Sequence, residues 1–110
     1  MSQQRLELTW IGKGKEPRLE PRILIEDPDK SFGDGKEENM LIYGDNLLAL
    51  KALEQRFTGK VKCIYIDPPY NTGNAFEHYD DGVEHSLWLN LMKQRLELLK
   101  KLLSRVLLLP

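Results

Sequence analysis

The fold is predicted by residues 40–70, which read MLIYGDNLLALKALEQRFTGKVKCIYIDPPY. The apolar run 40–43 has the length of a short strand and stops at the turn formed by Gly44-Asp45-Asn46. A helix of about three turns is predicted next, because apolar side chains then recur at helical spacing. These side chains are Leu47, Leu50, Leu53 and Phe57. A second strand is predicted at 61–66, whose nearly continuous apolar character is typical of parallel strands covered on both faces.

Strand, helix and strand in this order form a compact βαβ unit, which indicates an α/β fold. In a right-handed crossover the two strands lie parallel, so their carboxyl ends open on the same edge of the sheet. The turn 44–46 and the segment that starts at Asp67 are therefore expected to lie together, at the edge where α/β sheets bind ligands. Asp45 or Asn46 is placed to cap the helix, and Gly59 lies just past its predicted end.

The flanking segments have a different character. Residues 1–39 are rich in proline, glycine and charge, and we interpret them as a polar N-terminal arm, either a solvated leader or a docking arm. Residues 71–82 are predicted to be a polar loop. From about Val83 to Val106 the apolar spacing predicts a long helix that would pack on the sheet.

Between Lys93 and Arg105 the polar positions of this helix carry five basic residues against one acid, Glu97. The basic residues are Lys93, Arg95, Lys100, Lys101 and Arg105. Two interpretations stay open for them: a solvated helix face, or a stripe that contacts phosphates.

Composition limits the class of protein. The 110 residues are 41% hydrophobic and 30% charged with a formal net charge of −1, which is typical of a globular chain and gives no electrostatic sign of a nucleic-acid binder. Residues 1–15 lack the apolar core of a signal peptide, and we expect a cytoplasmic protein. The single cysteine, Cys63, is expected to be a small core residue of the second strand. Neither His78 nor His85 has a third ligand at metal spacing, so no metal site is expected.

The chemistry is predicted at Asp67-Pro68-Pro69-Tyr70, directly after the second strand. Two consecutive prolines keep the backbone extended and stiff as it leaves the sheet. The carboxylate of Asp67 and the carbonyl of Pro68 could accept the two hydrogens of an adenine amino group, which would free its delocalised lone pair, while Tyr70 stacks on the base. Such a base must first be flipped out of the duplex. The four letters alone also fit a rigid strand exit without chemistry.

Residues 39–103 resemble the N-terminal part of the DNA adenine methyltransferases that serve as modification subunits of type III restriction-modification systems. The resemblance is carried by Gly44-Asp45-Asn46, by residues 64–73 (IYIDPPYNTG) and by the helix with Trp88-Leu89 and Arg95-Leu96. The leader LTWIGKGKEPR is also similar to the start of those subunits. The resemblance implies a partial Rossmann-like, S-adenosylmethionine-dependent methyltransferase sheet, with an arm at 1–39 and the N-terminal portion of the catalytic domain at 40–110.

The resemblance also implies an activity and a set of site residues. The activity is transfer of a methyl group from S-adenosylmethionine to the exocyclic amine of adenine in double-stranded DNA. Asp67, Pro68, Pro69 and Tyr70 match the catalytic tetrapeptide, Tyr70 and Asn71 would bind the flipped base, and Asp45 matches an acidic position near the cofactor. The implied partners are a restriction subunit or a second methyltransferase subunit, with no membrane and no metal.

Two departures from the family pattern stand out. The family's Phe-x-Gly-x-Gly cofactor loop and its target-recognition region do not occur in these 110 residues, and the chain closes on RVLLLP at 105–110 where the family would turn into another strand. We therefore expect a truncated reading frame and an incomplete sheet. Two alternatives remain: an amino-directed cytosine DNA methyltransferase, and a non-catalytic binding fragment that needs a complementary methyltransferase half.

Overall fold

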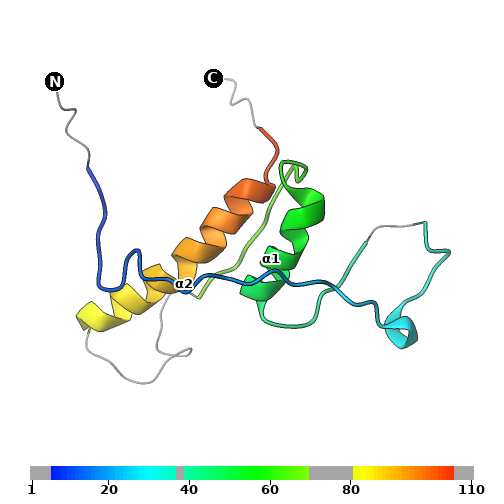
Figure 1. Ribbon diagram of the computed structural model, residues 1–110, viewed down its shortest axis with the longest axis horizontal. Coiled ribbons are helices and arrows are strands. Elements are labelled where there is room, and N and C mark those ends of the chain that lie inside the picture. Colours follow the sequence, from blue (N-terminus) through cyan, green and yellow to red (C-terminus); the bar gives the residue numbers. More distant parts are fainter. Residues whose placement is uncertain (1–5, 37–38, 70–80, 106–110) are drawn as a thin grey trace.

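A computed structural model describes residues 6–36, 39–69 and 81–105, with side chains from 85 onward in the last range. Three helical elements occur in these ranges. They are the single 3-10 turn η1 (Pro28–Lys30) and the α-helices α1 (Asn46–Phe57) and α2 (Asp81–Leu102). Figure 1 shows α1 and α2 side by side, with the N-terminal arm running across both. The described residues contain no helix that is both long and apolar enough to cross a lipid bilayer.

Helix α1 forms where its sequence predicts it. Asp45 is the N-cap residue, and its Oδ1 accepts a hydrogen bond from the backbone N–H of Leu47 at 2.8 Å. This bond satisfies one of the amide groups that a helix start leaves without an intrahelical partner. At the other end Gly59 has a φ of 71°, the left-handed conformation that glycine adopts without steric cost just past a helix end.

Helix α2 packs on α1 and supplies most of the small core. It begins at Asp81, two residues before the predicted start, so its first turn includes the end of the segment predicted as a loop. The buried apolar side chains are few: Ala52, Met92, Leu98 and Leu102. All lie on α1 or α2, which contact each other, so the hydrophobic core of the described residues belongs to this helix pair.

The two predicted strands are not formed, so the described residues do not show the predicted sheet. Neither 40–43 nor 61–66 is a strand, and Leu41, Tyr43 and Tyr65 are almost fully exposed. A strand is defined by backbone pairing with neighbours, and two short strands cannot sustain a sheet without further partners. Cys63 is likewise exposed rather than buried, because no sheet face forms to cover it.

One fragment of parallel pairing does occur, at the end of α2. Val61 and Leu103 form an isolated parallel bridge, in which the Val61 N–H donates to the Leu102 carbonyl at 2.9 Å and the Ser104 N–H donates to the Val61 carbonyl at 2.8 Å. The Gly59 N–H donates to the Lys101 carbonyl at 2.9 Å. The last carbonyls of α2 therefore find partners in the segment that follows α1.

The arm docks on α2 through polar side chains. The indole Nε1 of Trp10 donates to Oδ1 of Asn90 at 2.7 Å, and the Asn90 amide donates back to the Ile11 carbonyl at 3.0 Å. Gly12 lies so close that a Cβ built on it would be 2.7 Å from Nδ2 of Asn90. Of the two interpretations of the arm, these contacts favour a docking arm for residues 10–17.

An ion pair continues this contact one helical turn further along α2. The Lys93 ammonium lies 2.8 Å from a carboxylate oxygen of Glu16, and the Gln94 amide donates to the Pro17 carbonyl at 3.2 Å. The hydrogen bond from Lys93 lowers the pKa of Glu16, and the same bond raises the pKa of Lys93. The docked arm therefore has a charge dependence that a solvated leader would lack.

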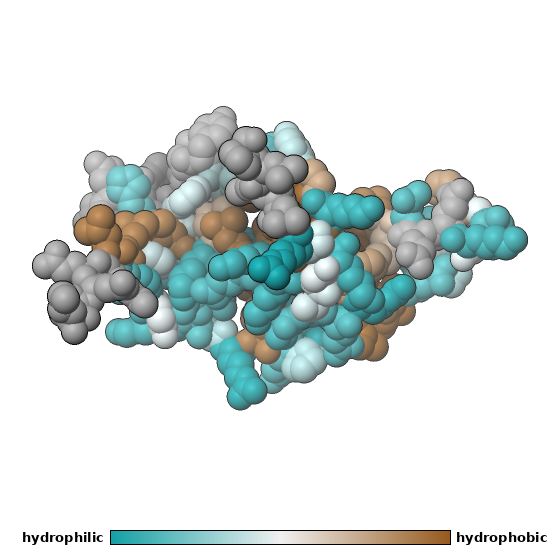
Figure 2. Space-filling model, turned by 90° about the horizontal axis from the view of Figure 1, so that it is seen from above, coloured by the Kyte–Doolittle hydropathy of each residue, from teal (hydrophilic) through white to brown (hydrophobic). Residues whose placement is uncertain are grey.

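The surface is unusually rich in exposed apolar side chains. Figure 2 shows several separate hydrophobic patches between hydrophilic areas. The exposed apolar residues come mainly from the arm and the two unformed strands, among them Leu6, Ile25, Phe32, Leu41 and Tyr65. The radius of gyration is 17.6 Å, against about 13 Å for a compact domain of this length. The chain is thus a helix pair with extended segments laid over it.

We predict that Leu102→Ala destabilises the helix pair by about 2 kcal/mol or more, because it removes one of the few buried side chains and leaves a cavity. Urea unfolding followed by the far-ultraviolet dichroism of the helices measures this loss. The matched control is Leu96→Ala on the same helix, where the side chain is 47% exposed and the change should stay within about 0.5 kcal/mol. Equal losses at both positions would contradict the assigned core.

We also predict that arm docking depends on pH. The lowered pKa of Glu16 means that the ion pair is complete above the ordinary value of 4.5 and is lost as the pH falls through the lowered value. The raised pKa of Lys93 means that it is complete below 10.5 and is lost as the pH rises through the raised value. Trp10 fluorescence in a Trp88→Phe chain measures docking. Lys93→Gln should remove both transitions, and unchanged transitions in that variant would contradict the assignment.

Candidate functional site

The described part of the predicted catalytic motif is Asp67-Pro68-Pro69. Asp67 and Pro69 are exposed and Pro68 is half-buried, and the segment carries no helix or strand assignment. Tyr70 and Asn71, the two other predicted site residues of this segment, lie outside the described residues. An exposed carboxylate next to a half-buried proline is accessible to a ligand from solution.

Helix α2 holds this segment through one side chain. The indole Nε1 of Trp88 donates a hydrogen bond to the Pro69 carbonyl. Trp88 itself is half-buried, and its N–H reaches the segment. The backbone of the predicted motif is thereby tied to the helix at its last described residue.

The same helix holds the predicted cofactor residue, Asp45. The guanidinium of Arg95 donates from Nε to Oδ1 of Asn46 at 2.7 Å, and its Nη2 lies 3.7 Å from Oδ1 of Asp45. A further bond, from Nη1 to the Leu91 carbonyl at 2.8 Å, fixes the guanidinium on its own helix. Asp45 thus both caps α1 and pairs with α2, while 58% of its side chain stays exposed.

Trp88 and Arg95 connect the two places that the sequence predicted to lie together. They are seven residues apart, which puts them on one side of α2 about two turns from each other. Trp88 contacts the motif segment, and Arg95 contacts the start of α1. Both segments are therefore bound to α2, although the sheet that was predicted to bring them together is not formed in the described residues.

Neither contact is predicted from the sequence, in which Arg95 belongs to the basic stripe and Trp88 to the helix residues that carry the resemblance. Their spacing of seven residues is the signal that indicates a shared face. Of the five basic residues in the predicted stripe, four lie on α2, which ends at Leu102. Three of them form ion pairs inside the chain: Lys93 with Glu16, Arg95 with Asp45 and Lys101 with Glu54. This pairing favours a structural role for these three over a phosphate-contacting stripe.

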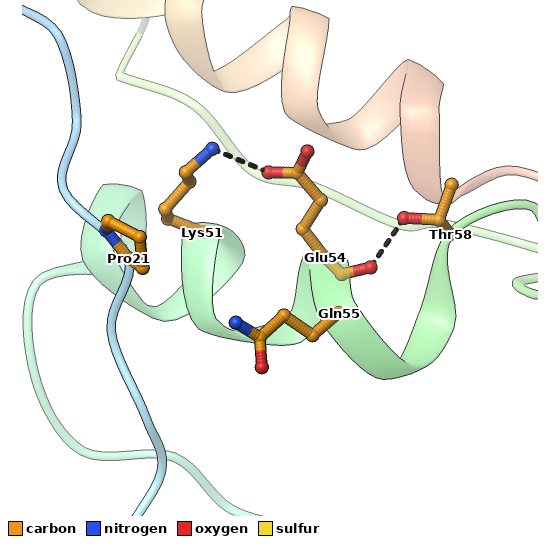
Figure 3. A pocket seen from close by; sticks show the side chains of 5 residues that line it. All are labelled: Pro21, Lys51, Glu54, Gln55 and Thr58. Carbon is orange, nitrogen blue, oxygen red and sulfur yellow. Dashed lines mark hydrogen bonds and ion pairs between the residues drawn. The ribbon is translucent and has the colours of Figure 1, made fainter.

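Two hollows on the surface lie between the arm and the helices, and neither is lined by residues 67–69. Figure 3 shows the first, lined by Pro21, Lys51, Glu54, Gln55 and Thr58. The Lys51 ammonium lies 2.9 Å from the Glu54 carboxylate, and this bond lowers the pKa of Glu54. The second hollow adjoins it and also includes Lys51. In the first hollow Lys51 and Glu54 pair with each other, and neither hollow contains a residue of the predicted motif, so the motif segment remains the candidate site.

Comparison with known proteins identifies relatives of the chain. A family model described as DNA methylase matches residues 61–107, which include the motif segment and α2. The probable type III restriction-modification enzyme HindVI Mod subunit of Haemophilus influenzae is 55% identical over 76 residues, covering 68% of this chain and 10% of that protein. No solved structure matches the chain.

Two further relatives match nearly the whole chain. The type III restriction-modification enzyme EcoPI Mod subunit of Escherichia phage P1 is 32% identical over 141 residues, covering 94% of this chain and 22% of its own length. The type II methyltransferase M.EcaI of Enterobacter cloacae is 42% identical over 116 residues, covering 91% of this chain and 24% of its own length. Matches of this extent reach into the N-terminal arm.

The chain spans between a tenth and a quarter of the length of these relatives. The matched part nevertheless includes the motif segment and the helix that holds it. On this evidence the chain belongs to the DNA methylase family, with Mod subunits of type III restriction-modification enzymes among its relatives.

Proposed function

We propose that this chain supplies the catalytic edge of a DNA adenine methyltransferase that acts in a restriction-modification system. The observation that carries the proposal is the Asp67-Pro68-Pro69 segment, exposed at Asp67 and held to α2 by the indole of Trp88. Relatives that are named as Mod subunits and methyltransferases support it. Residues 1–39 would be the arm of this protein, and residues 40–110 a portion of its catalytic domain.

The chemistry proposed for this edge is activation of an amine by orientation. The nitrogen of an adenine amino group is a weak nucleophile, because its lone pair is delocalised into the ring. The Asp67 carboxylate and the Pro68 carbonyl would each accept one of its hydrogens, which favours a pyramidal nitrogen with a directed lone pair. As the new N–C bond forms, the bond between the methyl group and the sulfonium sulfur would break and its electron pair would stay on the departing thioether. The nitrogen then loses one proton, for which the Asp67 carboxylate is the proposed acceptor.

The remaining site residues have proposed roles around this centre. Tyr70 would stack on the flipped base and Asn71 would contact its edge, which offsets part of the cost of unstacking. S-adenosylmethionine, when bound, supplies the electrophilic methyl group. The exposed carboxylate of Asp45 fits a contact with the hydroxyl or amino groups of such a cofactor, because Arg95 and the cap of α1 hold it in a fixed place.

Double-stranded DNA is the proposed substrate, with one adenine flipped out of the helix. A base inside the stack cannot reach the two acceptors, so extrusion of the target must precede methyl transfer. A restriction subunit or a second methyltransferase subunit is the proposed protein partner, since relatives of this chain are subunits of type III restriction-modification enzymes.

The test measures transfer of a labelled methyl group from S-adenosylmethionine to duplex DNA. The chain matches only a tenth of the Haemophilus Mod subunit, so the assay uses a hybrid protein. In this hybrid, residues 61–104 of the present chain replace the corresponding stretch of the Mod subunit. We predict methylation of adenine by this hybrid and a loss of at least about 100-fold in Asp67→Asn, because the amide cannot take up the proton. Nucleoside analysis of the digested DNA identifies the base.

The matched control for this test is Glu97→Gln, the same carboxylate-to-amide change at an exposed position of α2. It should leave the rate within about twofold, since exposed ion pairs contribute little. An Asp67→Asn hybrid that is as active as the parent would overturn the proposed role of this carboxylate. Label recovered on cytosine instead of adenine would overturn the proposed substrate.

A further inference from the structure

Proline geometry fixes most of the backbone of the motif segment but leaves one torsion open. The rings of Pro68 and Pro69 lock φ of both residues near −65°. A residue that precedes proline is confined to extended ψ values, which restricts ψ of Asp67 and of Pro68. No such restriction acts on ψ of Pro69, because the residue after it is Tyr70. That single torsion determines the direction of the Pro69 carbonyl and of the chain that follows.

A hydrogen-bond donor on α2 contacts the carbonyl whose direction depends on this torsion. The indole N–H of Trp88 donates to the Pro69 carbonyl, so it fixes the direction of that carbonyl relative to α2. Within the same helix, Arg95 fixes Asp45 and Asn46. Trp88 and Arg95 are both side chains of α2. This helix packs against α1 and carries most of the buried apolar residues, so the core holds the helix to which the motif segment is bonded.

We propose that Trp88 is a positioning residue for methyl transfer: its indole N–H fixes the Pro69 carbonyl and so ties the rigid segment that carries the Asp67 and Pro68 acceptors to α2. This inference rests on the proposed function for its catalytic meaning. Its structural claim is that the indole N–H, and not the ring, determines the direction of the Pro69 carbonyl. This claim can be tested without any activity. A phenylalanine at this position would keep an aromatic ring on the helix and lose the donor.

The chain offers a matched control for this substitution. Trp10 also donates its indole N–H, but to the side chain of Asn90 on the other contact surface of α2. Trp10→Phe therefore also removes an indole N–H that donates to α2, but it leaves the bond to the motif segment in place. Any general loosening of α2 should occur in both variants, whereas a change at Pro69 should occur only in Trp88→Phe.

The sequence also gives a unique spectroscopic probe. Pro69-Tyr70 is the one place where tyrosine follows proline in the 110 residues. A chain labelled with ¹³C at proline carbonyls and ¹⁵N at tyrosine amides therefore gives a single carbonyl-amide correlation, from the peptide bond whose carbonyl accepts from Trp88. The experiment records this correlation in the parent chain, in Trp88→Phe and in Trp10→Phe.

The proposal predicts that the correlation moves by more than its line width in Trp88→Phe and stays in place in Trp10→Phe. An unmoved correlation in Trp88→Phe would overturn it, as would equal shifts in both variants. This readout needs no catalysis, so it separates the positioning role from the proposed function. If the correlation shifts in Trp88→Phe but the hybrid transfers no methyl group, the structural assignment holds and the proposed function is wrong.

A kinetic readout completes the test in the active hybrid. Misplacement of the acceptors should lower kcat for methyl transfer by about 10- to 100-fold, while KM for S-adenosylmethionine changes by less than about twofold. Trp10 lies outside the exchanged stretch, so the kinetic control is the exposed Leu96→Ala on the same helix, which should keep both constants. A parallel fall of kcat in both variants, or a rise in KM alone, would overturn the positioning role.

Discussion

The structure depends on the hydrogen bonds that α2 makes to the segments around it. Its last carbonyls accept from the backbone of Gly59 and Val61, and polar side chains along its length bind the arm, the start of α1 and the motif segment. Within the described residues, the buried apolar side chains all lie on α1 and α2. Extended chain that lacks a sheet must satisfy its backbone groups elsewhere, and here α2 provides the partners.

This arrangement gives the candidate site its geometry. In an α/β sheet, parallel pairing would bring the two strand ends to one edge. In this chain Trp88 contacts the motif segment and Arg95 contacts the start of α1, both from one side of α2. The two segments are therefore attached to the same helix, although no strand pairing joins them in the described residues. Membership of the DNA methylase family and the tie between Trp88 and Pro69 together give the motif segment its proposed catalytic meaning.

Local features of the fold could be predicted from the sequence, and those that depend on distant partners could not. The α1 helix and its Asp45 cap follow from apolar spacing and a side chain two residues from the amide it binds. The predicted strands 40–43 and 61–66 failed because a strand needs neighbours that the described residues do not supply. The Trp88 bond to Pro69 spans 19 residues and the Arg95 bond to Asn46 spans 49, so no local pattern announces either.

Amide hydrogen exchange of Gly59, Val61 and Ser104 tests most directly whether α2 organises these segments. Each of these amides donates a backbone hydrogen bond at the junction between α2 and the chain after α1. If α2 holds the segments, the three amides exchange slowly and with the same denaturant dependence as the central amides of α2. Exchange of Val61 at the rate of an unstructured peptide, while the α2 amides stay protected, would contradict the account.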